Sequence, residues 1–303
     1  MPEPLASQFA NAATAAHDAF PEVLKRLVVV ARTFDTPVYV APEIAEHLTR
    51  NLEEVKQSVK AAAETLHQRN AGGIAMRFRS IAGEPVRMIA LDDAPAGVFS
   101  GGYTSEMRAN YILDHELGHY VVKGGFAGGH AGEAAADAFA TLRHIQRYGL
   151  NQDFFDYNNK ALPLVLAQSP IHYTTGVLRH VHQLAQQRDV TQLSLAETAA
   201  LAEEIAQQHA LSPSVMTKVT NAFADAGAAY LAAYGSQQAV KDKLYQQDKD
   251  AYALFVRETM KVQNSTTDPD IRAAIDEFFR YPPMMRFLAE NTPGPKPTPV
   301  PKP

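Results

Sequence analysis

No cysteine occurs among the 303 residues of the chain. Disulfide bonds, thiolate metal ligands and a cysteine nucleophile are therefore excluded. Any protein ligands to a metal have to come from histidine, aspartate or glutamate. The absence of cysteine also suits a reducing compartment.

The sequence also lacks an excess of basic charge and long apolar runs. Charged residues make up 20% of the chain and the net charge is -5, which is not the basic footprint of a nucleic-acid-binding protein. The longest early apolar run, residues 27–31, is far shorter than the roughly 20 residues needed to cross a bilayer. Residues 1–20 have neither the basic region nor the apolar core of a signal peptide. We expect a cytoplasmic protein, or one exported without an N-terminal signal peptide, that binds neither nucleic acid nor a membrane.

Hydrophobic residues make up 46% of the chain, enough to form a sizeable core in one large domain or two. Alternating apolar residues predict one or two strands in 27–42, a β-hairpin over 74–90 and a third strand at 96–104. Apolar residues at helical spacing predict helices over 4–20, 43–69, 105–123, 133–148, 152–161, 173–188, 194–209, 213–234, 237–262 and 269–280. The predicted fold class is α+β, mostly helical. A lobe with a small sheet spans 1–150, an all-helical lobe spans 151–290, and a cleft lies between them.

The strongest chemical signal is the segment His115-Glu116-Leu117-Gly118-His119, which has the form H-E-x-x-H. Residues four apart share one face of a helix, so His115 and His119 can direct their imidazoles at one metal ion. Glu116 is offset by one residue and can act as a general base on a water molecule without binding the metal. Gly118 is costly inside a helix, which calls for a reason such as close packing or access to the site.

The following predicted helix carries Glu133 and Asp137, again four residues apart on one face. A carboxylate from this second helix would complete a site with three protein ligands. A carboxylate one turn later can hold a ligating histidine by a hydrogen bond. From spacing alone, Asp137 or His130 remains an alternative to Glu133 as the third ligand.

H-E-x-x-H followed by E-x-x-x-D on the next helix resembles the gluzincin class of zinc metallopeptidases. The stretch from Glu133 to Asp137 is also similar to the E-x-x-A-D stretch of minigluzincins. The resemblance covers residues 104–148 and marks the first lobe as zincin-like. The metzincin pattern does not fit, because Val122 and Gly125 stand where that pattern requires Gly and His.

The resemblance implies Zn2+ as the cofactor and a protein or peptide as the substrate. It makes His115, His119 and Glu133 the zinc ligands, Glu116 the general base, and Asp137 the support of a ligating histidine. The three ligands leave a fourth position for water, whose pKa zinc lowers to about 7. An edge strand at 96–103 could hold an extended peptide by backbone hydrogen bonds.

Peptidases of this class usually need a further donor for the oxyanion, often a Tyr or His beyond the second helix. His172 and Tyr173, after Pro170, are the best candidates, and the alternative is that they only begin a helix. Tyr120 and His130 are nearer in sequence but less well placed. His130 is most simply a loop residue, with a role as a ligand or substrate contact as the alternative.

Two other functions remain open. In a non-enzymatic binding module, the zinc site would be structural or a relic, but such a site does not need Glu116 as a base. An effector or toxin would use the peptidase against one host protein. The proline-rich tail, 291–303, is predicted to be disordered and could dock in an SH3-like groove or act as a spacer.

Overall fold

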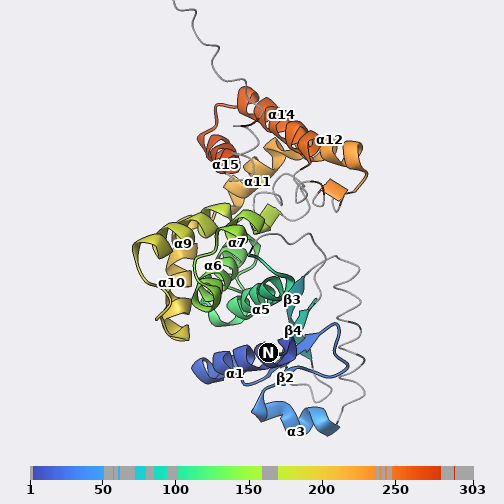
Figure 1. Ribbon diagram of the computed structural model, residues 1–303, viewed down its shortest axis with the longest axis vertical. Helices are drawn as coiled ribbons and strands as arrows, with labels where there is room; N and C mark the ends of the chain where they lie inside the picture. The colour runs from blue at the N-terminus through green and yellow to red at the C-terminus, as the bar shows by residue number, and fades with distance from the viewer. Residues whose placement is uncertain are drawn as a thin grey trace, which may run out of the picture.

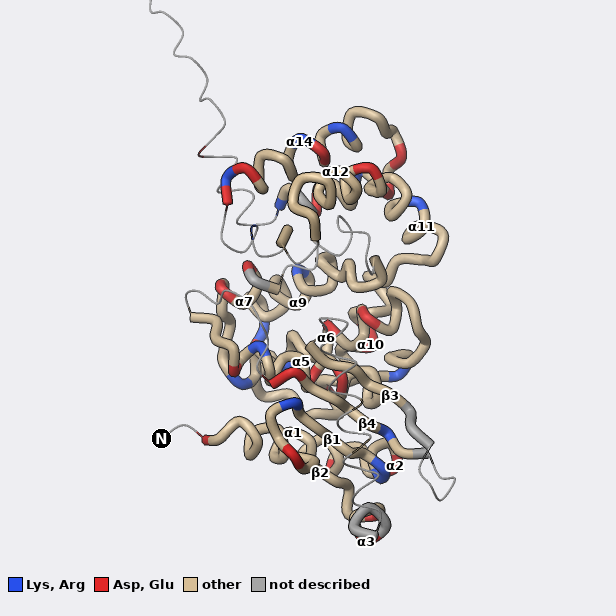
Figure 2. The backbone as a smooth tube through the Cα atoms, turned by 90° about the vertical axis from the view of Figure 1, so that its right-hand side faces the viewer, with Lys and Arg blue, Asp and Glu red and all other residues tan. Residues whose placement is uncertain are grey.

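A computed structural model describes residues 3–50, 57, 61, 72–79, 85–93, 102–158, 170–236, 239–240, 243, 248–280 and 290. The fold is α+β and mostly helical, with one small sheet, as the sequence predicts (Figure 1). In the tube view, Lys and Arg are interspersed with Asp and Glu over the described helices (Figure 2). Among the described helices, none combines the length with the apolar composition that a bilayer-spanning helix requires.

The sheet has four strands in the order β2-β1-β4-β3. They are β1 (Leu27–Ala31), β2 (Tyr39–Val40), β3 (Gly73–Arg79) and β4 (Pro85–Leu91). β1 runs parallel to β4, whereas the β1–β2 and β3–β4 pairs are antiparallel. All five residues of β1 are buried, which accounts for its continuous apolar run. The predicted hairpin over 74–90 is confirmed as β3–β4.

Helices α1 (Leu5–Ala19), α2 (Pro21–Leu24) and α3 (Pro42–Arg50) accompany the sheet. The helix predicted over 43–69 begins as α3, and most of its remainder lies outside the described residues. The strand predicted at 96–104 lies largely outside them as well, and the described residues Gly102 to Thr104 are not in a strand. Among the described strands, β3 therefore forms the sheet edge beside α5 (Ser105–Val121).

The helix with the H-E-x-x-H segment, α5, packs mainly against α6 (Gly129–Tyr148). Thr104 caps α5, because its side chain accepts a hydrogen bond from the backbone N–H of Met107. α6 begins at Gly129 rather than at residue 133, so His130 lies in its first turn and not in a loop. The low helix propensity of the glycines before residue 133 accounts for the later start that the sequence predicts.

The remaining helices show three further differences from the sequence prediction. A 3-10 turn precedes the helix predicted at 173–188, and Phe223 divides the helix predicted over 213–234 into two. The helix predicted over 237–262 is interrupted at Asp248, an extended residue whose side chain caps the helix that follows. The described elements are α7 (Gln152–Tyr157), η1 (Pro170–His172), α9 (Thr175–Gln187), α10 (Leu195–His209), α11 (Pro213–Ala222), α12 (Ala224–Tyr234), α14 (Lys249–Ser265) and α15 (Pro269–Phe279).

Two large hydrophobic cores hold most of the buried apolar residues that the structure describes, and a smaller cluster consists of Tyr103, Tyr111, Ala140 and Phe154. The first joins the sheet to α5, α6, α9 and α10, and the second joins α11, α12, α14 and α15. The division therefore falls after α10 rather than at residue 150, because the apolar faces of α9 and α10 pack on α6. The second group stands above the first in Figure 1, with α11 nearest to it.

Candidate metal centre

The side chains of His115 on α5 and Glu133 on α6 meet between the two helices. Nε2 of His115 lies 3.3 Å from Oε2 of Glu133. Both side chains are largely buried, with exposed fractions of 10% and 12%. The two predicted partners thus come together although 17 residues, 116–132, lie between them in the sequence.

The second histidine of the segment faces the same carboxylate. Nε2 of His119 lies 3.8 Å from Oε1 of Glu133. On the other side of the ring, Nδ1 lies 2.9 Å from the backbone oxygen of Gly125. A carbonyl oxygen only accepts, so Nδ1 carries the proton and leaves Nε2 free to bind a metal.

Asp137 supports His115 from behind. Its Oδ1 lies 2.8 Å from Nδ1 of His115 and also accepts a hydrogen bond from the hydroxyl of Tyr111 at 2.8 Å. Its Oδ2 accepts from Oγ1 of Thr174 at 2.5 Å. Asp137 is fully buried, and its three partners fix which nitrogen of His115 faces Glu133. This position makes Asp137 a support of His115 and leaves Glu133 as the carboxylate that faces both histidines.

Gly118 lets the two helices approach this closely. A Cβ at this position would lie 2.9 Å from Cα of Ala136 and 3.1 Å from its carbonyl oxygen. Carbon atoms of real side chains do not approach so near, so any larger residue here would push α5 and α6 apart. Close packing is therefore the structural reason for the glycine within the helix.

Glu116 lies beside the histidine pair and points toward the start of β3. It is buried, with 6% of its surface exposed. A Cβ on Gly73 would lie 2.9 Å from Oε1 of Glu116, so a glycine at this position leaves room for the carboxylate. Glu116 thus stands at the junction of α5 and the sheet edge.

Of the two candidate oxyanion donors, one side chain reaches the site and the other points away from it. His172 reaches the site, with Nδ1 2.7 Å from Oε2 of Glu133 and 38% of its side chain exposed. The hydroxyl of Tyr173 turns away and donates to the carbonyl oxygen of Ala274 at 3.3 Å, within the second core. The placement of Tyr173 contradicts its predicted role, because His172, the last residue of the 3-10 turn, and Tyr173, the next residue, point in different directions.

Two residues that the sequence analysis did not select, Tyr111 and Thr174, bind Asp137. Tyr111 lies one turn before His115 on α5, so helical spacing was a usable signal. The sequence gives no comparable signal for Thr174, because only tertiary packing brings this residue next to α6. Of the remaining candidates, the hydroxyl of Tyr120 donates to the carbonyl oxygen of Met76 in β3 at 2.7 Å.

The electrostatics of the protein side chains differ between the two histidines. Burial opposes protonation of His115, but the charge and hydrogen bond of Asp137, aided by Glu133, raise its pKa to about 10. Burial and the charge of His115 lower the pKa of His119. Burial opposes ionisation of Glu133, but His115 and His172 outweigh it and hold the pKa of that carboxyl far below its usual range. Glu133 is therefore an anion.

The donor set fits a metal ion. One donor atom each of His115, Glu133 and His172 lies within 4.8 Å of the others, and the Nε2 of His119 faces the same carboxylate. Oε2 of Glu133 is buried, and nitrogen atoms of His115 and His172 lie near it. Among the described residues, however, no group makes a hydrogen bond of good geometry to this oxygen. Imidazole nitrogens with a carboxylate oxygen are ligands that Zn2+ prefers.

A comparison of the chain with family models, with curated proteins and with solved structures finds no match.

Proposed function

We propose that the protein is a zinc-dependent metallopeptidase with a gluzincin-like centre. One observation carries the proposal: His115 and His119 both turn Nε2 toward Glu133, and each ring is held by its Nδ1. The ligands would be His115, His119 and Glu133. This arrangement supports a catalytic centre, in which three protein ligands leave one position open.

Zinc, when bound, supplies a Lewis acid that polarises the substrate carbonyl and lowers the pKa of water. Glu116 acts as the general base: its carboxylate takes a proton from the attacking water and returns it to the nitrogen of the leaving amine. Burial of Glu116 strengthens its electrostatic interactions with the reacting groups, because fewer water molecules screen them. Asp137 holds the proton-bearing Nδ1 of His115 throughout.

His172 is the proposed donor to the oxyanion. Its ring stands at the edge of the centre, and more than a third of the side chain is exposed, so a substrate can approach it. A donor placed where negative charge develops typically contributes about 10²- to 10³-fold in rate.

The outer strand β3 is a place for the peptide backbone to bind. Its first residue, Gly73, borders Glu116, so an extended chain paired with β3 would pass close to the general base. In this proposal β3 takes the part that the sequence analysis gave to residues 96–103.

A structural metal site in a non-enzymatic module is the second candidate, and the position of His172 favours it. If His172 bound the metal along with His115, His119 and Glu133, four protein ligands would close the coordination sphere. Such a site would stabilise the contact between α6 and η1 but would have no use for Glu116.

The proposal is tested by the zinc content of the full chain, purified free of metal and reloaded, together with hydrolysis of a mixed peptide library. Wild type and Glu116→Gln are both expected to bind one zinc, and only wild type is expected to cleave. The general-base contribution corresponds to about 10²- to 10⁴-fold in rate. A wild type that binds no zinc contradicts the proposal. Zinc in both proteins with cleavage in neither supports the structural site.

A further inference from the structure

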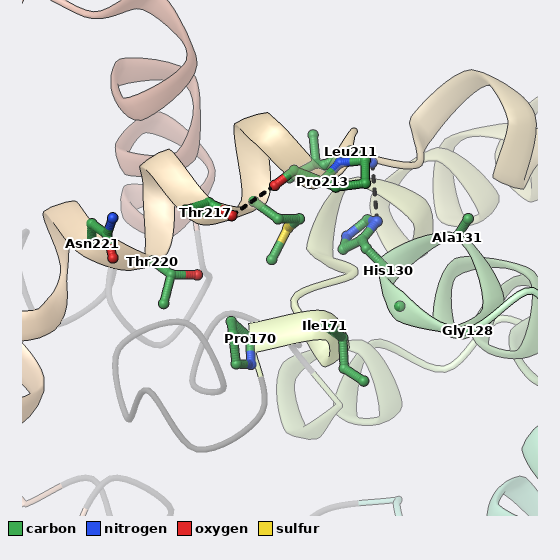
Figure 3. Close-up of a pocket in the computed structure, with 12 residues that line it drawn as sticks. Gly128, His130, Ala131, Pro170, Ile171, Leu211, Pro213, Thr217, Thr220 and Asn221 are labelled. Atoms are coloured by element: carbon green, nitrogen blue, oxygen red, sulfur yellow. Dashed lines mark hydrogen bonds between the residues drawn. The ribbon is translucent and has the colours of Figure 1, made fainter.

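A cavity of about 420 Å³ opens between the two groups of helices (Figure 3). The first turn of α6 and the turn η1 form one side, and one face along the length of α11 forms the other. Its size falls in the range of pockets that enclose small organic groups, about 300–1,000 Å³. Much of its lining is apolar and comes from Pro170, Ile171, Leu211, Pro213 and Met216.

The cavity adjoins the candidate metal centre through two shared elements. Ile171 lines the cavity, and the next residue, His172, places Nδ1 2.7 Å from Glu133. His130 lines it from α6, one helical turn before Glu133. A peptide whose backbone passes the centre could therefore place one side chain in the cavity.

His130 fixes the walls of the cavity. Its Nε2 lies 2.7 Å from the carbonyl oxygen of Tyr173, and its Nδ1 accepts a hydrogen bond from the backbone N–H of Leu211 at 3.0 Å. One neutral ring thus links α6, the segment after η1 and the segment before α11. Both ring nitrogens are engaged, so His130 shapes the cavity and is not a metal ligand in this arrangement.

The lining selects the chemistry of the occupant. No Lys, Arg, Asp or Glu is among the described residues that line the cavity, so a charged group would lose hydration there without gaining an ionic partner. Polar side chains are those of Thr217, Thr220 and Asn221 on α11, together with His130. A large aromatic or aliphatic group would gain the most from burial.

We infer that the cavity is the subsite for a large apolar side chain of the peptide substrate, next to the bond that is cleaved. This inference rests on the proposed peptidase function. It assigns a part of the second core, the helix α11, to substrate selection. Met216 and Thr220 are the residues expected to set the size of the side chain that fits.

The first test compares peptides that differ at one residue, Phe, Leu, Ala or Asp, with the zinc-loaded full chain. We expect kcat/KM for Phe or Leu to exceed that for Ala by about 10- to 200-fold, the discrimination typical of apolar pockets. Thr220→Trp should fill the cavity and reduce this ratio by about tenfold or more. Met216→Ala should enlarge the cavity and favour Trp over Leu.

Met260→Ala is the matched control, because Met260 lies on α14 and is 46% exposed. It should leave the ratio as in wild type. Equal rates for all four peptides, or a preference that Thr220→Trp does not change, would overturn the inference while leaving the peptidase function intact.

A second readout does not depend on activity. Methyl NMR of the metal-free chain, labelled at methionine, is followed during titration with N-acetylphenylalanine amide and with N-acetylaspartate amide. The Met216 resonance, assigned by its loss in Met216→Ala, should shift with the phenylalanine compound only, and the Met260 resonance should not shift. No shift of Met216 up to the solubility limit would overturn the inference, whether or not peptides are cleaved. A shift without any cleavage by the zinc-loaded chain would overturn the peptidase function and, with it, the assignment of this apolar cavity as a substrate subsite.

Discussion

His115 and His144 are both buried on the α5–α6 pair, yet their surroundings are opposite. His115 has a carboxylate at each ring nitrogen, and its pKa is raised to about 10. His144 stacks on Phe154 at a ring distance of 3.8 Å, and neither of its nitrogens has a hydrogen-bond partner among the described residues. Burial, with a further contribution from the charge of Arg147, lowers the pKa of His144 to about 3.

The contrast shows that burial alone does not make a histidine functional. The same two helices hold a histidine used as an aromatic ring in a small cluster with Tyr103 and Phe154. Among the described residues, the carboxylates of Glu133 and Asp137 give His115 the orientation and the charge environment that the proposed ligand role requires. Four predictions test or sharpen this difference.

The largest effect is expected when each histidine is replaced by Phe. His115→Phe should weaken zinc binding by on the order of 10³-fold, since structural zinc sites bind with about 10–16 kcal/mol shared among their ligands. His144→Phe should keep one zinc per chain with unchanged affinity, because only an aromatic contact is altered. Competition with a zinc-binding dye measures both. Equal loss in the two variants would mean that burial, and not the carboxylates, defines the site.

The second largest effect is expected to distinguish the role of His172 in catalysis from that of its neighbour Tyr173. His172→Ala should lower kcat by about 10²- to 10³-fold and leave zinc affinity unchanged, as expected for the loss of an oxyanion donor. Tyr173→Phe should leave kcat nearly unchanged, because that hydroxyl bonds to Ala274. Steady-state kinetics with metal analysis distinguish the two roles. Loss of zinc in His172→Ala would instead make His172 a ligand and favour the structural site.

Asp137→Asn sharpens the role of the carboxylate behind His115. Loss of this charge should reduce zinc affinity by about 10- to 100-fold, the usual effect of removing a hydrogen-bonded support of a ligand. Asp114→Asn is the control, since Asp114 is equally buried on α5 but pairs with Arg147 at 2.6 Å. It should cost stability and leave zinc affinity as it was. A similar drop in affinity for both variants would argue against a specific role for Asp137.

The smallest effect is a pH dependence of stability from His144. Its pKa of about 3 in the folded chain is below the value of about 6.5 in the unfolded chain. The unfolded state therefore takes up a proton first, and the free energy of unfolding falls as pH decreases from about 6.5 toward 3. At pH 5.5 the loss is about 1.4 kcal/mol relative to pH 7.5.

His144→Phe should remove this loss, as urea denaturation of metal-free wild type and variant at pH 7.5 and 5.5 would show. If both proteins lose stability equally between these two pH values, His144 is not the neutral buried ring that the structure describes.

Spacing within the two helices was enough to predict the main geometry of the site. Residues four apart fix one face of α5 and one face of α6, so the sequence alone assigns His115, His119, Glu133 and Asp137 to facing positions. The fold class and the hairpin followed from the same kind of periodicity. These features are local, and local periodicity is what a single sequence records best.

Contacts between distant segments could not be predicted in this way. The bond from Thr174 to Asp137 and the opposite directions of His172 and Tyr173 depend on how η1 packs against α6. The boundary between the cores was also misplaced, because α9 and α10 carry ordinary amphipathic patterns that do not say which core they join. Each of these features depends on tertiary packing rather than on spacing along the chain.

Gly118 has a consequence for any redesign of the centre. The histidine helix and the glutamate helix touch there through backbone atoms, 2.9 Å from the place of a Cβ. The two atoms nearest to that place are backbone atoms of Ala136, so small rotamer changes cannot tune the separation of the proposed ligands. A larger ion such as Ca2+, which needs bonds of about 2.3–2.6 Å, would have to force the two helices apart as whole bodies. Redesigning the proposed site for a larger ion would therefore start with the contact between Gly118 and Ala136, although neither residue is a proposed ligand.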